Sequence, residues 1–237
     1  MVTCGEELKA ISNTYVALIA YSTDIRICNE EKLMVTWESI FPTPLMRASI
    51  GGGFADDEQK FFKKMQAVLH KNVANLRSAN TRILDAPEMQ RIRSIIEEHI
   101  NQYAWKVISA NPNHEFYITQ SWLNFTKPGE SHHRHTHTNS LISGVLYIAA
   151  KKEMDSICFY RDSALQRQIL TTNDQLNSYN TSSECIGVGA GDLLLFPSNL
   201  THGVNQTSGE HTRISLAFNT FVRGEIGSED RLNSLCI

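Results

Sequence analysis

The sequence is poor in cysteine, and none of its five cysteines belongs to a CxxC pair. The odd count argues against a disulfide framework and favours a reducing compartment. The chain also shows no basic segment followed by an apolar core near its start, so no secretory signal is expected. Its most apolar early run, residues 15–21, is too short to cross a bilayer. These absences predict a cytoplasmic protein that has no membrane partner.

The chain has no marked excess of charge, with 22 basic and 25 acidic residues and a formal net charge of −3. No stretch interleaves basic and aromatic residues as a nucleic-acid groove does, so no nucleic-acid partner is expected. Internal repeats and low-complexity tracts are absent as well. What is present is 237 residues, 41% of them hydrophobic, which suits one large domain or two small ones with a full core.

Two segments in the first half carry apolar residues at helical spacing. The first covers residues 56–77. The second covers residues 85–107, with Asp85 as the expected N-cap and a proline in the first turn. Before them, residues 6–21 are compatible with a short helix. Residues 40–57 contain two prolines and three consecutive glycines, which favours an extended, turning segment.

From about residue 115 the pattern changes to short runs rich in β-branched and aromatic residues, divided by Gly, Pro, Asn and Asp. Helices followed by many short strands predict a mainly β fold, a barrel or jelly roll with helices packed outside it. A long polar stretch at residues 161–184 is expected to form a surface insertion or a lid over a site. The expected strands are "EFYITQSWLNFT", "SLISGVLYIAA", "DSICFYR", "ECIGVG", "DLLLFP" and "TRISLAFNTFV".

Four of the nine histidines fall within residues 132–137, in the stretch "SHHRHTHTNS". Successive side chains of a strand point to opposite faces, so a strand here would place His133, His135 and His137 on one face. His132 would point to the other face. Two neutral imidazoles two residues apart on an inward face converge on one metal ion. For an arbitrary HxH pair, however, a hydrated loop is the commoner explanation.

Three further features favour a metal site over a hydrated loop. A Pro-Gly turn at residues 128–129 immediately precedes the histidines. His202 follows an apolar strand and a turn, within "GDLLLFPSNLTHGV". Arg213 and Ser215 stand two residues apart, on one face of a later strand. An inward arginine in a barrel is costly unless it meets an anion, and its planar fork matches a carboxylate.

This constellation resembles the 2-oxoglutarate- and Fe(II)-dependent dioxygenases, and most closely a branch of oxygenases from marine phages and bacteria. The similar segments are "IFPTPL" (40–45), "SWLNFTKPGESHHRHTHTNSLISGVLYI" (121–148), "GDLLLFPSNLTHGV" (191–204) and "RISLAFN" (213–219). The resemblance spans roughly residues 39–222 and implies a double-stranded β-helix, a cupin-like jelly roll with the metal at one mouth. We therefore expect residues 39–237 to form the oxygenase domain, with residues 1–38 as an N-terminal extension.

The resemblance also implies roles for individual residues. The Pro-Gly turn is similar to the one that precedes the metal motif in alkylation-repair and prolyl-hydroxylase relatives, and its spacing places the first two metal ligands at His135 and His137. The third ligand falls on His202. Arg213 would bind the far carboxylate of 2-oxoglutarate, with Ser215 assisting. Strand positions that commonly touch 2-oxoglutarate in relatives fall on Asn124, Thr126 and Tyr147.

The chain departs from the usual His-x-Asp/Glu…His motif of the superfamily, because His137 stands where the carboxylate normally is. Three imidazoles leave Fe(II) at a charge of +2, which dianionic 2-oxoglutarate then neutralises. Other cupin dioxygenases hold iron with three histidines, so the change is compatible with activity. In the alternative, water fills this position as in some halogenases, but the face shared with His135 favours ligation by His137. The remaining histidines of interest, expected to serve structure or surface, are His114, His132, His133 and His211.

The resemblance thus implies a hydroxylase that uses Fe(II), 2-oxoglutarate and O2 on a C–H bond and releases succinate and CO2. Its substrate would be a small molecule or a peptide, such as a prolyl side chain. Two alternatives stay open: a three-histidine cupin dioxygenase that works without 2-oxoglutarate, and a non-catalytic jelly-roll binding module. Arg213 argues against the first, and the intact set of site residues argues against the second.

Overall fold

The structure is a computed structural model that describes residues 24–26, 34–161 and 175–237. The short helix expected at residues 6–21 lies outside the described residues. None of the helices within the described residues is long and apolar enough to cross a membrane.

The chain divides into two compact units, Met1–Thr43 and Pro44–Ile237. In the smaller unit, β1 (Asp24–Arg26) and β2 (Met34–Thr36) form an antiparallel pair. The larger unit contains all the predicted strands and all the histidines of the stretch described above.

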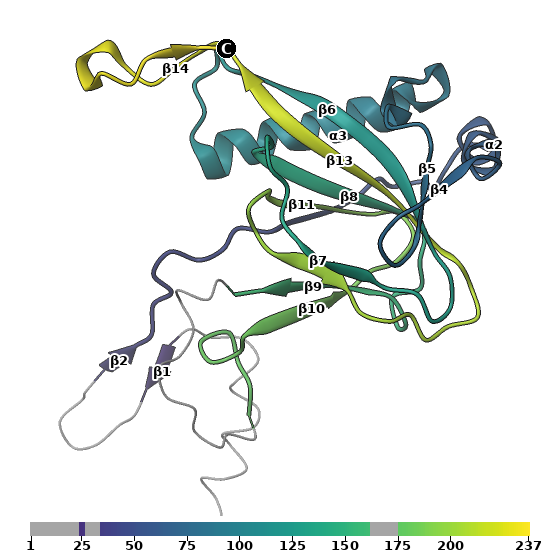
Figure 1. Cartoon of the computed structure of the whole chain (residues 1–237). Coiled ribbons are helices and arrows are strands. Elements are labelled where there is room, and N and C mark those ends of the chain that lie inside the picture. The colour runs from purple at the N-terminus through teal and green to yellow at the C-terminus, as the bar shows by residue number, and fades with distance from the viewer. Residues whose placement is uncertain (1–23, 27–33, 162–174) are drawn as a thin grey trace, which may run out of the picture. The chain divides into compact units, whose positions relative to one another are not determined.

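Two large antiparallel sheets form most of the larger unit (Figure 1). Among the described residues, the first sheet has seven strands in the order β3-β11-β8-β13-β6-β5-β4, and the second has four in the order β10-β9-β12-β7. The strands of the first sheet are β3 (Met46–Ser49), β4 (Leu69–Lys71), β5 (Leu76–Ser78), β6 (Glu115–Thr126), β8 (Ile142–Ala149), β11 (Asp192–Pro197) and β13 (Arg213–Arg223). Those of the second are β7 (His132–His135), β9 (Ser156–Tyr160), β10 (Ser183–Gly187) and β12 (His202–Val204).

The prediction of a mainly β jelly roll with packing helices is confirmed. Each of the six strands expected after residue 115 is present, and β6 and β11 have the expected bounds. The sequence missed short strands, among them the small C-terminal pair of β14 (Glu225–Ile226) and β15 (Leu235–Cys236). Strands of two to four residues carry too few alternations to stand out from loops.

Alternate residues of the seven-stranded sheet pack into two separate cores. On β11, Leu193 and Leu195 join the cluster that includes the helices, whereas Leu194 and Phe196 join a smaller cluster with the four-stranded sheet. Because both faces are covered, the strand reads as a continuous apolar run rather than an alternating one. The space between the two sheets is therefore the place where inward polar residues of β6, β8 and β13 meet.

The helix predicted over residues 56–77 ends early. α2 covers Asp56–Met65, and the rest of the segment forms the hairpin of β4 and β5. β5 pairs with β6, so the hairpin extends the larger sheet. The prediction was wrong because backbone pairing with an existing strand outweighs helical spacing in a segment of marginal propensity. Val68 and Val73, which the helical stripe would bury, are exposed.

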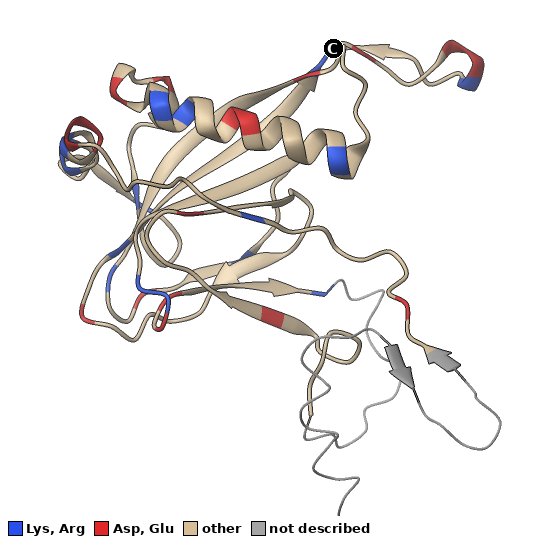
Figure 2. Cartoon of the chain, turned by 180° about the vertical axis from the view of Figure 1, so that it is seen from behind, with Lys and Arg blue, Asp and Glu red and all other residues tan. Residues whose placement is uncertain are grey.

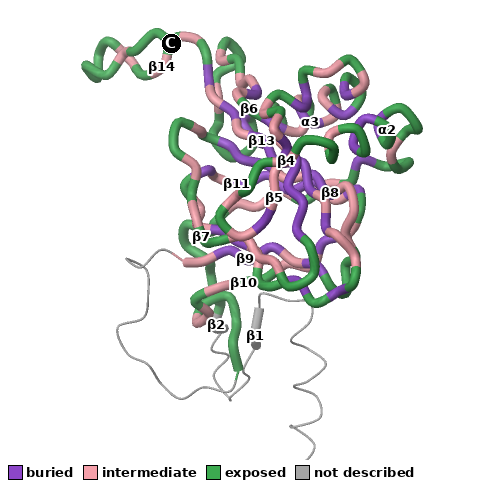
Figure 3. Tube along the Cα trace, turned by 45° about the vertical axis from the view of Figure 1, so that its right-hand side comes forward, coloured by how far each residue is buried: buried purple, intermediate pink, exposed green. Residues whose placement is uncertain are grey.

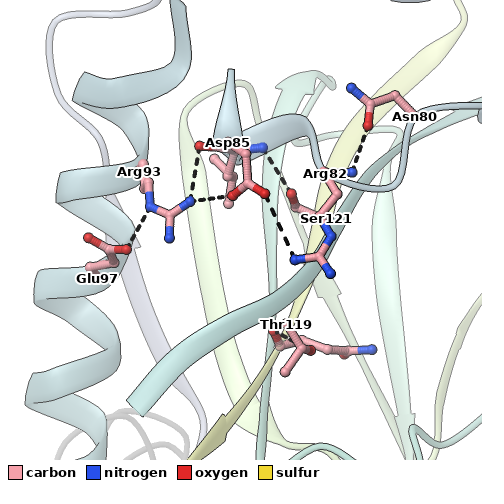
Figure 4. A network of polar contacts seen from close by, with 9 residues as sticks. Asn80, Arg82, Asp85, Arg93, Glu97, Thr119 and Ser121 are labelled. Atoms are coloured by element: carbon pink, nitrogen blue, oxygen red, sulfur yellow. Dashed lines mark hydrogen bonds and ion pairs between the residues drawn. The ribbon is translucent and has the colours of Figure 1, made fainter. Parts of the chain in front are cut away.

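The second predicted helix begins later than expected. α3 covers Gln90–Tyr103, and two short 3-10 turns precede it. Asp85 does not cap the helix, because its carboxylate pairs with Arg93 on the helix instead (Figure 4). Pro87 explains the delay, since a residue before proline is kept out of the helical region and here is extended.

The apolar stripe of α3 faces the core as predicted. Its last member differs, because Val107 lies in the π-helical turn η3 (Ala104–Ile108) and is 40% exposed. The buried members of the stripe are Met89, Ile92, Ile96, Ile100 and Tyr103.

The cysteines differ from expectation. Cys158 of β9 and Cys185 of β10 lie directly opposite each other and form a disulfide. Sequence separation hid this pair, because the two strands are joined through the long polar segment and only their register brings the thiols together. Cys236 is free and exposed.

Charged residues and buried residues occupy different parts of the fold. Lys, Arg, Asp and Glu gather on α2, α3 and the connections, while the strands are largely uncharged (Figure 2). Buried residues concentrate in the strands of the two sheets and on one side of α3 (Figure 3). Of the expected surface insertion or lid at residues 161–184, residues 162–174 lie outside the described residues. Residues 175–179 are exposed, residues 178–180 form a turn, and the segment ends inside β10.

Candidate active site

The register of two short strands sets two histidines side by side. β7 pairs antiparallel with β12, which places His135 opposite His202 with ring centroids 4.4 Å apart. His202 is buried, because Phe196 and Phe159 pack around its ring at centroid distances of 4.7 and 6.3 Å. The apolar run of β11 thus supplies a wall of the site.

His137 joins this pair from the loop that follows β7. Its backbone N–H donates to the carbonyl of Ser198 over 2.9 Å, which ties the loop to the end of β11. Its Nε2 lies 3.3 Å from Nε2 of His202, and the ligand atoms of His135, His137 and His202 all lie within 4.8 Å of one another. Two ligands at right angles on bonds of about 2.1 Å lie roughly 3 Å apart, so this trio fits one metal ion.

Two of the three imidazoles are oriented by backbone carbonyls. Nδ1 of His135 donates to the carbonyl of His133 over 2.8 Å, and Nδ1 of His202 donates to the carbonyl of Leu200 over 2.8 Å. A neutral imidazole that donates through Nδ1 carries a lone pair on Nε2, which is the atom a metal needs. The partner of His137 differs: its Nδ1 lies 3.0 Å from Nδ2 of Asn219.

Burial keeps these imidazoles neutral. It lowers the pKa of His202 to about 3 and that of His137 to about 4, and it lowers the pKa of His135 as well. Desolvation is the largest cause in each case, and neighbouring histidines add repulsion between the charged forms. Neutral imidazole is the metal-binding form, so the site can receive a cation without first losing protons at neutral pH.

The predicted alternation fails at a β-bulge in β7. His135 pairs with His202, yet His132 pairs with Val204, so three steps along β7 match two along β12. Such an extra residue reverses the side-chain alternation. His132, predicted to face away, therefore lines the same cavity as His135, their rings stacked at 4.6 Å. His133, predicted to share the face of His135, is exposed, but its ring lies 4.9 Å from that of His135, and the ligand atoms of His132, His133 and His135 lie within 4.8 Å of one another.

A glycine opposite the bulge allows the two strands to approach. A Cβ on Gly203 would lie 3.0 Å from the carbonyl oxygen of His132, 3.2 Å from that of His133 and 3.3 Å from the amide nitrogen of Arg134. All three neighbours are backbone atoms, so none can rotate aside. The "THGV" sequence thus provides both the buried histidine and the close contact that shapes β7.

Arg213 lies on the same inner face, at the start of β13. It is 3% exposed; its Nη1 donates to the carbonyl of Ser156 over 3.1 Å, and its Nε has no hydrogen-bond partner among the described residues. A buried guanidinium with an unused donor is costly unless an anion completes it. The surroundings of Arg213 therefore suit a carboxylate.

Three adjacent strands bring the other expected residues beside Arg213. Ser215 lies opposite Asn124 of β6 and Tyr147 of β8, and all three line the cavity with Arg213. Asn124 Oδ1 is buried without a partner in the described residues, so it too is open to a ligand. Thr126 is not brought into the cavity: it is fully buried, and its hydroxyl accepts from Asn75 over 3.3 Å.

One cavity thus joins the histidines and the arginine. It is lined by the histidine trio, His132, Arg213 and apolar residues of β8 and β11. Its volume is about 30 Å³, enough for about one water molecule, so a larger ligand enters only when lining side chains move.

A larger groove of about 1070 Å³ lies elsewhere, between α3 and the start of β6. Its charged residues already pair with one another, Arg93 with Asp85 and Glu97, as Figure 4 shows. It contains no group of metal-ligand side chains among the described residues. The smaller cavity between the sheets is therefore the candidate active site.

Comparison with protein families agrees with this site. Residues 120–219 match a family model described as "Putative 2OG-Fe(II) oxygenase". Over these residues the chain is similar to that family. The matched segment contains every candidate site residue, from Asn124 to Ser215. The description of that family names Fe(II) and 2OG, which are the metal and the cosubstrate to compare with the residues of this cavity. The donor set agrees, because three imidazoles converge near a buried guanidinium.

Solved structures share the fold of this chain. An oxidoreductase of the 2OG-Fe(II) oxygenase family from Burkholderia pseudomallei is 9% identical with a TM-score of 0.50, over 74% of this chain and 83% of that chain. HygX from Streptomyces hygroscopicus, with nickel, 2-oxoglutarate and hygromycin B bound, is 13% identical with a TM-score of 0.52, over 75% and 82%. A prolyl-4-hydroxylase from Pseudomonas putida is 12% identical with a TM-score of 0.50, over 77% and 94%. A search of curated proteins finds no match.

Two residues that contact or line the candidate site were not predicted from the sequence. His132 was missed because a bulge is invisible in the strand pattern. Asn219 had a signal: counted in steps of two from Arg213 along β13, it falls on the same inner face as Ser215. Its side chain contacts His137, which sits in a loop 82 residues away in sequence.

Proposed function

We propose that this chain is an Fe(II)- and 2-oxoglutarate-dependent hydroxylase in which His135, His137 and His202 hold the iron and Arg213 binds the far carboxylate of 2-oxoglutarate. The observation that carries the proposal is a single cavity lined by three convergent neutral imidazoles and a buried arginine with an unused donor. Neither the three imidazoles nor the buried arginine alone would identify the ligand of this cavity. Together they match a metal ion and a dicarboxylate that chelates it.

The chain's own residues would bind, orient and exclude water. Three imidazoles position the metal, while Arg213 and Ser215, with Asn124 and Tyr147 beside them, hold the cosubstrate at one end. When bound, Fe(II) with 2-oxoglutarate supplies the activation of O2 that hydroxylates a C–H bond and releases succinate and CO2. The apolar walls of β8 and β11 keep solvent away from this chemistry.

In the proposed site the charges of the metal and of 2-oxoglutarate cancel, although no ligand of the protein is charged. Three neutral imidazoles leave Fe(II) at +2, and the two negative charges of 2-oxoglutarate bring the metal complex to neutrality. Arg213 then adds one positive charge, which meets the far carboxylate directly. Because no carboxylate belongs to the proposed ligand set, the dianion contributes more of the binding here than at a two-His-one-carboxylate site.

One other function is favoured by a specific observation. A ligand set of histidines alone suits a cupin dioxygenase that works without 2-oxoglutarate. The buried Arg213 supports the 2-oxoglutarate form, since a guanidinium in this cavity needs an anion. A carboxylated substrate would satisfy it in the alternative form, so cosubstrate dependence is the property to measure.

The wider assignments are part of the same proposal. Residues 39–237 would form the oxygenase domain and residues 1–38 an extension, in a cytoplasmic protein without a nucleic-acid partner. The substrate would be a small molecule or a peptide. HygX has been solved with hygromycin B bound, and the Pseudomonas putida relative is a prolyl-4-hydroxylase, so related folds accept both classes.

The test is spectroscopic and needs no known substrate. Fe(II) and 2-oxoglutarate are added without oxygen, and the weak visible charge-transfer band of their chelate is recorded. Oxygen is then admitted and succinate is assayed. We expect both the band and slow uncoupled succinate formation. Bound metal without band or succinate would contradict the 2-oxoglutarate form.

Matched histidine variants make this test specific. His202→Ala is expected to abolish the band, because it removes a proposed ligand. His70→Ala alters an exposed histidine of β4 and is expected to keep it. Equal loss in both variants would mean that the band reports general destabilisation rather than the proposed site.

A further inference from the structure

We infer that Asn219 is a positioning residue, whose side-chain amide sets the tautomer of His137 and so decides whether that imidazole presents a lone pair to the metal. The inference rests on the proposed role of His137 as a ligand. Asn219 belongs to β13 and would act on the metal only through His137.

The contacts of Asn219 fix where its amide lies. Its Nδ2 is 3.0 Å from Nδ1 of His137, and its Oδ1 accepts from the hydroxyl of Ser143 over 2.8 Å. Ser143 lies directly opposite Asn219 in the register of β13 and β8. The amide therefore bridges the sheet and the loop that carries His137, with one polar atom toward each.

Beyond Ser143, the contact continues as a chain of hydroxyl groups. Ser143 Oγ is 2.8 Å from Ser198 Oγ, which is 2.7 Å from Ser140 Oγ. Ser143 and Ser198 are almost fully buried, at 2% and 1% exposed. Each hydroxyl both donates and accepts, so the hydrogen bonds between the three serines can run in either direction. Ser140 Oγ donates either to Ser198 Oγ or to the carbonyl of Ile142, which is 3.4 Å away.

His137 consequently has two arrangements. In the first, Asn219 Nδ2 donates to Nδ1, so the proton of the neutral ring sits on Nε2 and points at Nε2 of His202, 3.3 Å away. His202 can accept it, because its own proton is on Nδ1, bound to the carbonyl of Leu200. In this arrangement both ring nitrogens of His137 make hydrogen bonds within the protein, but His137 has no lone pair left for a metal.

In the second arrangement the amide is turned over. Asn219 Oδ1 then accepts from Nδ1–H of His137, Nδ2 donates to Ser143, and the hydroxyl chain reverses. The ring gains a proton on Nδ1 as it loses one from Nε2, so it stays neutral and its Nε2 lone pair faces the metal. Metal binding selects this arrangement, as second-shell acceptors do for other histidine ligands.

His137 thus differs from its two neighbours. His135 and His202 face backbone carbonyls, which can only accept, so each has one tautomer whether or not metal is bound. His137 faces an amide, which can either donate or accept. A carboxylate in place of Asn219 could only accept, and an apolar side chain could do neither.

Nitrogen NMR of labelled histidines tests the assignment directly. In wild-type protein stripped of metal by a chelator, His137 is expected to carry its proton on Nε2. Addition of Zn(II), a diamagnetic probe, is expected to move that proton to Nδ1. His135 and His202 should be protonated on Nδ1 throughout. A metal-free His137 already protonated on Nδ1 would overturn the two-arrangement assignment.

Substitutions separate the amide's role from simple packing. Asn219→Asp is expected to hold His137 as the Nδ1–H tautomer without metal and to bind Zn(II) at least as tightly as wild type. Asn219→Leu is expected to weaken Zn(II) binding about 10- to 100-fold. Asn205→Leu, at an exposed asparagine after β12, serves as the control and should bind as wild type does.

The outcomes distinguish this inference from the proposed function. If Zn(II) binds without shifting the Nε2 resonance of His137, the proposed ligand set fails and the inference with it. If Zn(II) shifts that resonance but Asn219→Leu binds Zn(II) like wild type, only the role of Asn219 fails. Equal weakening in Asn219→Asp and Asn219→Leu would also overturn it. Should the leucine variant not fold, the tautomer of Asn219→Asp decides alone.

Discussion

Arg213 is the single residue whose surroundings say most about what the cavity receives. Its guanidinium is buried beside the histidines, uses a carbonyl of β9 for one donor and leaves its Nε without a partner among the described residues. Tyr147 lies 5.7 Å away with its ring toward the guanidinium, and burial raises the pKa of that phenol to about 12, so it stays neutral. The local charge is therefore positive, and it suits an anionic group.

Replacing Arg213 by Gln should change cosubstrate affinity and stability in opposite directions. We expect 2-oxoglutarate binding to weaken by about 2–4 kcal/mol, because a buried charge-assisted pair is lost. The ligand-free protein should be as stable or more stable, since an uncompensated charge is removed. Anaerobic titration of the chelate band and denaturant unfolding measure the two effects. Unchanged cosubstrate affinity would show that the carboxylate binds elsewhere.

Residue positions were predictable where spacing along one strand indicated them. Arg213 and Ser215 could be placed from their period-two spacing, and His202 from the strand and turn before it. Asn219 follows the same period, but its function depends on a loop histidine that no local pattern connects to it. His132 was assigned to the wrong face, because the bulge that turns it inward depends on pairing with β12.

At the scale of elements, the bulge in β7 is the feature that assembles the histidines. It places both His132 and His135 in the lining of the cavity, while His133 and Arg134 are exposed. Arg134 there packs over the ring of Tyr160, 3.8 Å from its centroid. The geometry of the site is thus a property of two paired strands rather than of the histidine stretch alone.

Gly203→Ala tests the contact that accommodates the bulge. The new Cβ would meet backbone atoms of β7 at 3.0–3.3 Å, so β7 or β12 must shift. We expect a loss of about 1–3 kcal/mol in the free energy of unfolding and weaker metal binding. Gly189→Ala is the control, because its Cβ would meet ordinary contacts of 3.7–4.0 Å. If both variants bind metal equally well, the close approach does not shape the site.

How well the other elements could be predicted depended on their length. Strands of five residues or more with continuous apolar or alternating patterns were predicted well, as β6 and β11 illustrate. The β4–β5 hairpin was mistaken for helix, because its apolar residues happen to recur at helical spacing and its partner strand lies far along the sequence. Pairing between distant segments is the information that a local pattern lacks.

At the scale of the whole molecule, the jelly roll explains why the site was largely predictable. Its two sheets bring β7, β12 and β13 together whatever the loops contain, so a histidine pair, a distant histidine and an arginine converge once the fold is assumed. The disulfide between Cys158 and Cys185 shows the converse. It follows from the register of β9 and β10, which the sequence did not indicate.

The neutral histidines make stability depend on pH. In the metal-free folded protein, burial lowers the pKa of His132 and His202 to about 3 and that of His137 to about 4, below the ordinary value of 6.5. Between these values the unfolded chain binds more protons than the folded one, so stability falls as pH falls. We expect the free energy of unfolding to decrease steadily from about pH 6.5 toward pH 4.

Denaturant unfolding of chelator-treated protein at a series of pH values measures this dependence. His137→Asn removes one of the titrating groups and should reduce the slope. Stability that stays constant between pH 7 and pH 5, or that rises on acidification, would show that these imidazoles are not held neutral by the fold.

We propose that three imidazoles, with no carboxylate, hold an Fe(II) ion in this chain. A crystal structure of the complex with Fe(II) and 2-oxoglutarate, grown without oxygen, tests it most directly. We predict one ion with Nε2 of His135, His137 and His202 each at about 2.0–2.2 Å. An ion bound by His135 and His202 with water in the place of His137, or an ion held by His132, His133 and His135, would contradict it.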